Sequence, residues 1–309
     1  MKLYKPNTMK RALLISLTLL FVSTVAFAQQ RNMYSQYMLD KYSVNPAVAG
    51  STPYSPIALS YKQFWTGINE APSIQSLSGH FAIGDNMGVG GRLYNYSTSP
   101  TSIQGIEGTY AYHISVSDNS KLSLALTGML YQSQLDKSEL LMKDADDDVV
   151  LYSSNRLIVP DAGFGAYYYG ENYYAGLSVP NLFNRRVDLM NDDLLDNRQV
   201  RHYFLHGGYI FEFGDVKAEP SVLLRYIEAG IFQADINAKA TYKDMFSLGV
   251  SYRLGDAVAV MAGVGNKNIL FGYSYDITLS NIKNASNGSH ELMLIYKLGG
   301  VSSPPKFGG

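Results

Sequence analysis

The chain has 309 residues, a formal net charge of -1 and no cysteine. A nearly neutral charge argues against a nucleic-acid-binding protein, which needs a basic face to displace counterions. The lack of cysteine excludes disulfides, thiolate metal sites, cysteine nucleophiles and a cysteine-linked lipid anchor.

The first 28 residues are typical of a secretory signal peptide. Lys10 and Arg11 precede a short apolar run, and the small residues Ala26 and Ala28 stand just before Gln29. A charged start, a short apolar middle and a small-x-small exit define such a signal. A membrane-spanning helix needs about 20 apolar residues, and this run is shorter. We therefore expect cleavage after Ala28 and export of the mature protein.

Residues 29–56 are rich in aromatic side chains but show no strand alternation. The segment carries Tyr34, Tyr37 and Tyr42, followed by the sequence "NPAVAGS". We expect it to fold as an inner plug or to lie along a periplasmic partner. The alternative is that it forms a flexible tail. Asn45 and Pro46 in this segment are candidate partner contacts.

From residue 57 onward the sequence alternates between apolar and polar residues. In "KDMFSLGVSYR", Phe246, Leu248 and Val250 alternate with Ser247 and Ser251. This period of two places the two classes of residue on opposite faces of a pleated strand. We expect fourteen strands, at roughly 57–65, 73–83, 87–97, 103–114, 120–131, 161–169, 173–180, 200–212, 216–228, 231–242, 245–254, 257–265, 268–276 and 289–298.

Three features favour a membrane barrel over a soluble sandwich. Many segments have the roughly 9–11 residues that a tilted transmembrane strand needs. Charged residues fall in mid-segment on the non-apolar face, which in a barrel is the lumen. Short connections alternate with longer ones, which is the pattern of short periplasmic turns and longer extracellular loops. The residues expected to line the lumen are Arg92, Arg225, Asp235, Lys239 and Arg253.

The sequence therefore predicts an all-β fold, a transmembrane antiparallel β-barrel of about 14 strands over residues 57–298. Lipid cannot satisfy an open strand edge, so the sheet must close. Residues 299–309 are rich in Gly, Pro and Ser and are expected to form a flexible tail. No nucleic-acid partner is expected, and the outer-membrane lipid is expected to surround the barrel.

Aromatic residues gather where the strands are expected to leave the membrane. Tyr167, Tyr169 and Tyr173 flank the turn "GEN", and the single tryptophan, Trp65, stands at the end of the first strand. Amphipathic rings are enriched at the headgroup level, so we expect these four at the membrane interface. The neighbouring tyrosines of the cluster should point into the lumen. Trp65 is also a candidate partner contact on an outer loop.

Two patterns resemble metal sites but are weak. Asp144, Asp146 and Asp148 lie in one acidic loop, but the Gly and Glu that complete a calcium loop are missing. We expect a solvated loop there, with a weak calcium site as the alternative. His202 and His206 lie about 13–14 Å apart if they are on one strand, too far for one ion. No metal, cofactor or catalytic residue is therefore assigned.

Eight blocks of the sequence, in order from residue 33 to 296, resemble the PorP/SprF family of Bacteroidota. They include "YSQYMLDKYSVNPAVAGS", "KQFWTGINEAPSIQSLSGHF", "GAYYYGENYYAGLSVPNLFN" and "DINAKATYKDMFSLGVSYR". The resemblance implies a non-enzymatic outer-membrane component of type IX secretion and gliding motility. Some members help to export or retain large surface adhesins, and others contact a periplasmic protein that binds peptidoglycan.

The expected function is thus to anchor or help export secreted surface proteins by docking their C-terminal domain. The outer loops 132–160 and 181–199, or the mouth of the barrel, are the expected dock, while the N-terminal segment and the periplasmic turns face periplasmic secretion components. The alternative is an outer-membrane channel for hydrophobic or small solutes. A barrel hydrolase is a distant third reading, because no motif marks a nucleophile.

Overall fold

The computed structural model describes residues 34–136, 156–183, 200–228 and 230–299. The expected signal peptide, the acidic loop with Asp144, Asp146 and Asp148, and residues 300–309 lie outside the described residues. Among the described residues, no helix has the length and apolarity to cross a membrane.

Fifteen strand segments in the described part of the chain form one antiparallel sheet. β8 and β9 both pair with β10 and are separated only by Ile210, so together they make one strand of the wall. The segments are β1 (Ser55–Gln63), β2 (Ser73–Ile83), β3 (Met87–Thr98), β4 (Thr101–Ser117), β5 (Ser120–Leu135), β6 (Arg156–Gly170), β7 (Tyr173–Val179), β8 (His202–Tyr209), β9 (Phe211–Phe213), β10 (Val216–Ile227), β11 (Ile231–Tyr242), β12 (Phe246–Arg253), β13 (Ala257–Gly265), β14 (Ile269–Thr278) and β15 (Ser289–Leu298).

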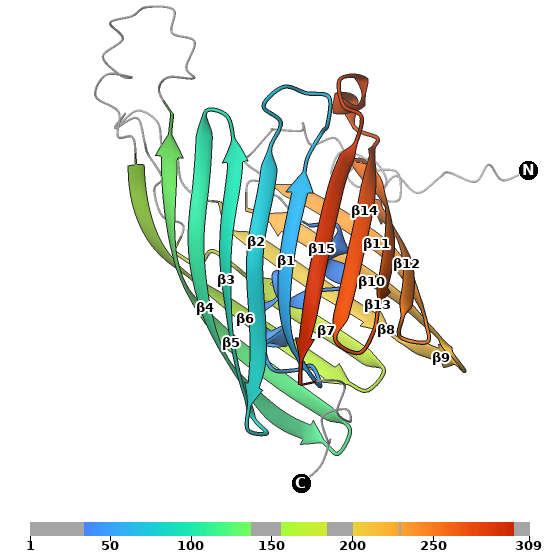
Figure 1. Cartoon of the computed structure of the whole chain (residues 1–309). Coiled ribbons are helices and arrows are strands. Elements are labelled where there is room, and N and C mark those ends of the chain that lie inside the picture. Colours follow the sequence, from blue (N-terminus) through green and yellow to red (C-terminus); the bar gives the residue numbers. More distant parts are fainter. Residues whose placement is uncertain (1–33, 137–155, 184–199, 229, 300–309) are drawn as a thin grey trace, which may run out of the picture. The chain divides into compact units, whose positions relative to one another are not determined.

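The sheet is closed. Each strand pairs with its neighbours in the chain, β10 pairs with β11, and the first strand pairs with the last, from Ser55 opposite Leu298 to Gln63 opposite His290. The predicted 14-stranded antiparallel barrel is confirmed (Figure 1). Closure leaves no ladder edge facing lipid, where unpaired backbone groups cost several kcal/mol each.

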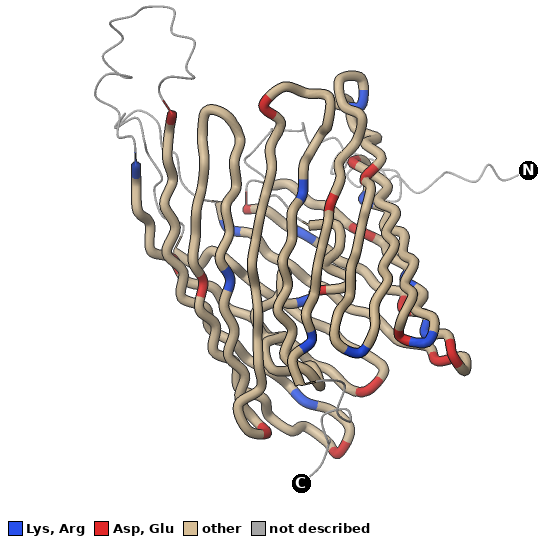
Figure 2. Tube along the Cα trace, viewed as in Figure 1, with Lys and Arg blue, Asp and Glu red and all other residues tan. Residues whose placement is uncertain are grey.

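The alternation of the sequence becomes the two faces of the wall. Leu59, Leu126 and Leu248 point outward and are more than half exposed, whereas Ser60, Thr127 and Ser247 between them are buried. Apolar side chains outside and polar side chains inside are what a barrel in lipid requires. Figure 2 shows charged residues at mid-height of the strands as well as at their ends.

The two ends of the barrel differ in their connections. Residues 84–86, 118–119, 171–172, 214–215, 243–245 and 266–268 form tight turns at one end, here called the short-turn end. The opposite end, the long-loop end, receives the connections 64–72, 136–155, 180–201 and 279–288, together with three shorter ones. In outer-membrane barrels short turns face the periplasm and long loops face outside.

Residues 34–51, here called the plug, lie inside the barrel. They form three short 3-10 helices, η1 (Gln36–Met38), η2 (Lys41–Ser43) and η3 (Pro46–Val48). Asp40 and Asn45 start η2 and η3, because their side chains accept hydrogen bonds from Tyr42 N and Ala47 N. Figure 1 shows these helices in blue among the strands. The segment was expected either to form an inner plug or to lie along a periplasmic partner, and in the structure it forms an inner plug.

Candidate functional site

The plug and the wall around it form the polar interior of the protein. Hydrogen bonds or ion pairs join the plug to strands on all sides of the barrel, which places it in the lumen and not beside the wall. The bonded strands are β1, β2, β3, β4, β6, β7, β8, β10, β11, β12, β14 and β15.

The first residues of the plug meet a group of buried charges near the long-loop end. Ser35 N donates to Glu291 (2.6 Å) and Ser35 Oγ donates to Asp276 (2.6 Å). Lys62 Nζ lies 2.8 Å from Asp276 and 2.6 Å from Ser35 Oγ. Gln36 N also donates to Glu291. The side chains of Lys62, Asp276 and Glu291 are 5% exposed or less, so each charge depends on these partners. Ser35, Gln36, Lys62, Asp276 and Glu291 are called the latch below.

A second group of charges continues from the latch. Arg253 lies 3.7 Å from Asp276 and 3.4 Å from Asp235, and Arg225 lies 3.6 Å from the other oxygen of Asp235. Tyr37 of the plug donates to Asn237 at 2.8 Å and to Asp235 at 3.3 Å. Three residues expected in the lumen, Arg225, Asp235 and Arg253, are thus buried together inside the barrel.

A third group ties η2 to the opposite side. Glu219 accepts ion pairs from Lys41 of the plug (2.9 Å) and Lys239 (2.7 Å), and Tyr174 donates to it at 2.8 Å. The ion pair between Lys41 and Glu219 holds the plug electrostatically.

Arg92 holds η2 from a further side. It makes a bidentate ion pair with Glu107 and donates to the carbonyl oxygen of Ser43 at 3.2 Å. Beside it, Tyr42 donates to Thr109 at 3.0 Å. Arg92 and Lys239, which also donates to Met38 O, complete the expected lumen set.

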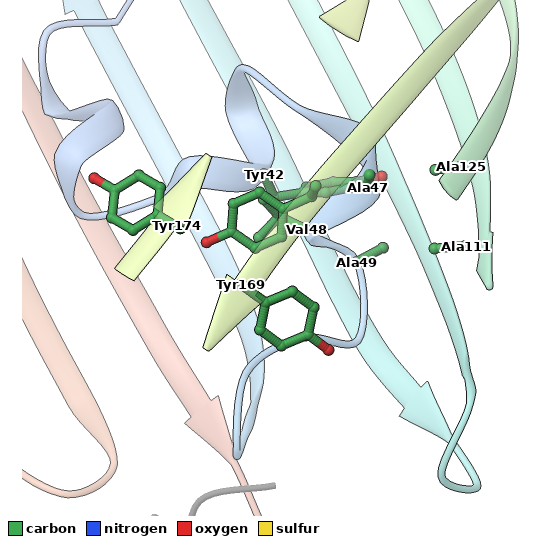
Figure 3. Close-up of a cluster of buried hydrophobic side chains, with 9 residues drawn as sticks. Tyr42, Ala47, Val48, Ala49, Ala111, Ala125, Tyr169 and Tyr174 are labelled. Atoms are coloured by element: carbon green, nitrogen blue, oxygen red, sulfur yellow. The ribbon is translucent and has the colours of Figure 1, made fainter. Parts of the chain in front are cut away.

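The tyrosine cluster corrects one expectation. Tyr167 and Tyr169 were expected at the membrane interface, but both are only 6% exposed and belong to a buried cluster with Tyr42, Tyr174 and Ala47 of η3. Figure 3 shows Tyr169 and Tyr174 beside the plug. The rings face inward because they share a strand face with Asp161, while Tyr168 faces outward. Tyr173 is 37% exposed, and its interfacial role stays a prediction.

Asn45 also lies inside. Its side chain donates to Ala166 O at 3.0 Å, bonds His206 Nε2 at 3.0 Å and is fully buried. The expectation that Asn45 contacts a partner protein is therefore wrong, because the barrel wall uses all of its surface. Pro46 is half-buried at the first position of η3.

Trp65 lies at the long-loop end with a left-handed backbone, at φ 43°. Its ring is half-buried against the cluster of Tyr34, Phe64 and Ile74. The backbone N–H of Trp65 donates to Ser289 Oγ at 3.1 Å, and Thr66 N donates to Gly288 O at 2.7 Å. Loop 64–72 is thereby fixed to loop 279–288.

Three histidines, His80, His113 and His206, contact the plug. His113 Nε2 bonds Ala49 O at 2.9 Å, and His80 Nδ1 accepts from Gly50 N at 3.2 Å. His206 stacks on Tyr167, with centroids 5.7 Å apart. In the described ranges, no group of three or more His, Cys, Asp or Glu side chains is placed to hold a metal ion.

Glycines mark where the plug backbone meets the wall. A Cβ at Gly88 would overlap the carbonyl oxygen of Ala49, and one at Gly165 would overlap the Asn45 side chain. Gly272 similarly faces Gln36. These inward glycines could have signalled a close approach in the sequence. The alternation of apolar and polar residues indicated which positions face inward. It did not show which residues these inward positions contact.

Replacing Gly88 with alanine should therefore destabilise the barrel, by about 1–3 kcal/mol, because overpacking forces the plug backbone to move. Gly128→Ala is the matched control, since a Cβ there would meet no atom within 4 Å. Denaturant unfolding of both variants in detergent measures the effect. Equal stability of the two variants would show that Ala49 of the plug is not in close contact with Gly88 of β3.

Comparison with known proteins identifies the chain. It matches the family model described as "Type IX secretion system membrane protein PorP/SprF" over residues 26–296. Among solved structures, the toluene transporter TbuX of Ralstonia pickettii is similar with a TM-score of 0.51 and 8% identity, over 82% of this chain and 92% of that chain. The CymD monoaromatic hydrocarbon channel has a TM-score of 0.48 and 12% identity, over 87% and 94%.

At 8% identity, the likeness to TbuX extends to the fold alone. A search of curated proteins finds no match. The family match, in contrast, covers the plug and nearly the whole barrel. The chain therefore belongs to the PorP/SprF family of type IX secretion system membrane proteins and forms a β-barrel of the outer membrane.

Proposed function

We propose that this type IX secretion barrel is a sealed, non-enzymatic anchor that holds the C-terminal domain of a secreted surface protein at its long-loop end. The observation that carries the proposal is the plug. A lumen crossed by a segment that bonds strands on all sides is suited to holding a partner at its mouth and poorly suited to passing solutes.

The long-loop end offers a firm surface for this role. Loops 64–72 and 279–288 are joined by backbone bonds between Thr66, Asn287 and Gly288, at 2.6 and 2.7 Å. Tyr34 supports Phe64 and Trp65 from inside. A left-handed backbone is uncommon for a bulky residue such as Trp65, and strained residues of this kind concentrate at functional sites. Loop 64–72 is held by Tyr34 and by loop 279–288, so it loses little conformational entropy when a partner binds.

The short turns are the proposed contact surface for a periplasmic secretion component. Because residues 34–51 are inside the barrel, they do not extend toward a periplasmic partner as one expectation had it. The described turns carry charged residues, including Asp85, Asp118, Glu171, Asp215 and Lys243. Such charges suit a polar, reversible contact with a periplasmic secretion component.

Replacing Trp65 with alanine tests the dock. Binding of a C-terminal domain from a type IX secreted surface protein to the purified barrel should weaken at least tenfold, since truncation of an interface Trp costs about 2 kcal/mol or more. Trp65→Phe keeps a ring and should bind more tightly than Trp65→Ala. The measurement is surface plasmon resonance on barrels that retain the folded, heat-modifiable band on a gel. Undiminished binding by Trp65→Ala would remove this loop from the dock.

A further inference from the structure

Although the wall closes around the lumen, one short strand edge stays open at the short-turn end. β7 begins at Tyr173, which is opposite Tyr209 of β8, so β9 (Phe211–Phe213) extends past the end of β7. Among the described residues, β9 pairs only with β10, whereas every other strand has a partner on each side. In Figure 1, β9 lies at the lower right, at the tip of a yellow hairpin.

Glu212 carries the open hydrogen-bonding groups of this edge. In an antiparallel ladder the backbone groups of successive residues point to alternate sides. Ile210 N donates to Asn172 O at 2.7 Å, so the backbone of Ile210 points away from β10. The N–H and C=O of Glu212, two residues later, therefore point the same way. No residue in the described part of the chain bonds these two groups.

Three aromatic rings lie in a row beside this edge. The centroids of Tyr209 and Phe211 are 4.7 Å apart, and those of Phe211 and Phe213 are 6.3 Å apart. The three side chains are 44%, 45% and 66% exposed, and Val216, opposite Phe213 on β10, is exposed as well. A contiguous exposed apolar strip of this kind marks a contact with another molecule.

Neither lipid nor a second copy of the chain fits this edge. The exposed carboxylate of Glu212 and its open backbone groups are costly in hydrocarbon, so the edge lies in water on the periplasmic side. Barrel strands tilt by about 35–45°. In two barrels related by an axis along the membrane normal, the β9 edges would cross at roughly twice that angle, which prevents a ladder between them.

We propose that β9 is the docking strand for a periplasmic protein, which adds an extended segment to this edge by β-augmentation. A polypeptide backbone supplies both the acceptor and the donor that Glu212 lacks. Every second side chain of the added segment would lie on the row of rings and should be apolar. Lys or Arg between them would face Glu212 and Glu171, which are both exposed. The proposal rests on the periplasmic contact proposed above and names its site.

Photo-crosslinking in cells tests the docking strand. Benzoylphenylalanine replaces Phe213 or, as the matched control, Phe246, which is exposed at the same end but lies on β12 between two paired strands. Asp118, in the turn 118–119, is replaced in the same way. Adducts are purified with the barrel, and the crosslinked segment is sequenced by mass spectrometry.

We expect the probe at Phe213 to give a polypeptide adduct several-fold above that at Phe246, with the crosslink in a segment of alternating apolar and basic residues. Adding Glu212→Pro should lower the adduct by about three- to tenfold, because proline removes the edge donor and leaves the ladder to β10 intact. Glu212→Gln keeps the N–H and removes only the charge, so it should lower the adduct less. Both are compared in barrels that retain the folded, heat-modifiable band.

An adduct at Phe213 that contains only lipid or a second copy of the barrel would overturn the inference. Equal effects of Glu212→Pro and Glu212→Gln would also overturn it, since the edge donor would then have no role. A polypeptide adduct at Asp118 with none at Phe213 would remove β9 from the contact and leave the proposed periplasmic contact standing. The absence of a polypeptide adduct at both positions would contradict both.

Discussion

Replacing Glu219 with glutamine should lower the free energy of unfolding by about 3–5 kcal/mol, because it breaks a buried charge group by removing one member. Lys41 and Lys239 both lie within 3 Å of this carboxylate. A neutral amide would leave two ammonium groups facing each other in the lumen. Guanidinium unfolding of the barrel in detergent, followed by the folded band on a gel, measures the change.

The matched control is Asp244→Asn. Asp244 pairs with Lys217 at 2.9 Å, but the two side chains are 70% and 41% exposed. An exposed pair contributes about 0–1 kcal/mol, and Asn tolerates the left-handed backbone at this position. An effect of Glu219→Gln no larger than that of Asp244→Asn would show that the lumen is hydrated and the plug weakly held.

The second large effect concerns permeability. Eight strands enclose a lumen that side chains fill, whereas about 16–18 strands leave an aqueous channel. A barrel of fourteen strands lies between these sizes, and here the plug occupies the interior. We expect the natural protein in liposomes to pass no more small solute than empty liposomes. Replacing the plug, residues 34–51, with a Gly/Ser segment of equal length should produce steady flux.

The flux experiment must distinguish a barrel that leaks because it is misfolded from a folded barrel that leaks because it lacks the plug. Only plug-replaced protein that keeps the folded, heat-modifiable band is compared, and Gly128→Ala serves as a folded control with an intact plug. Equal and steady flux through the natural and plug-replaced barrels would contradict a sealed lumen. That result would favour the channel function that the sequence left as the alternative.

The wall could be predicted from the sequence because one physical rule acts on every strand. Lipid on one face and polar contacts on the other impose a period of two, so segments 73–83, 231–242, 257–265 and 289–298 have the predicted bounds in the structure. Where strands continue beyond the membrane, alternation weakens and the bounds were too short, as in β5 and β6, which reach Leu135 and begin at Arg156.

The interior was harder to predict because its partners are distant in sequence. Each plug helix has only three residues, so no periodic pattern marks it, and its stability comes from the wall. Asn45 meets His206, which is 161 residues away. Tyr167 and Tyr169 could have been assigned to the inner face by their shared parity with Asp161. The plug residue Tyr42, which belongs to the same buried cluster, is too distant in sequence to have been recognised as their neighbour.

The most direct test of the sealed anchor is the surface proteome of cells that lack this gene. Surface biotinylation followed by mass spectrometry should show loss of one or more type IX secreted surface proteins, restored by the natural protein, with unchanged entry of small solutes. An unchanged set of surface proteins, together with reduced solute entry, would contradict the account and identify the barrel as a channel.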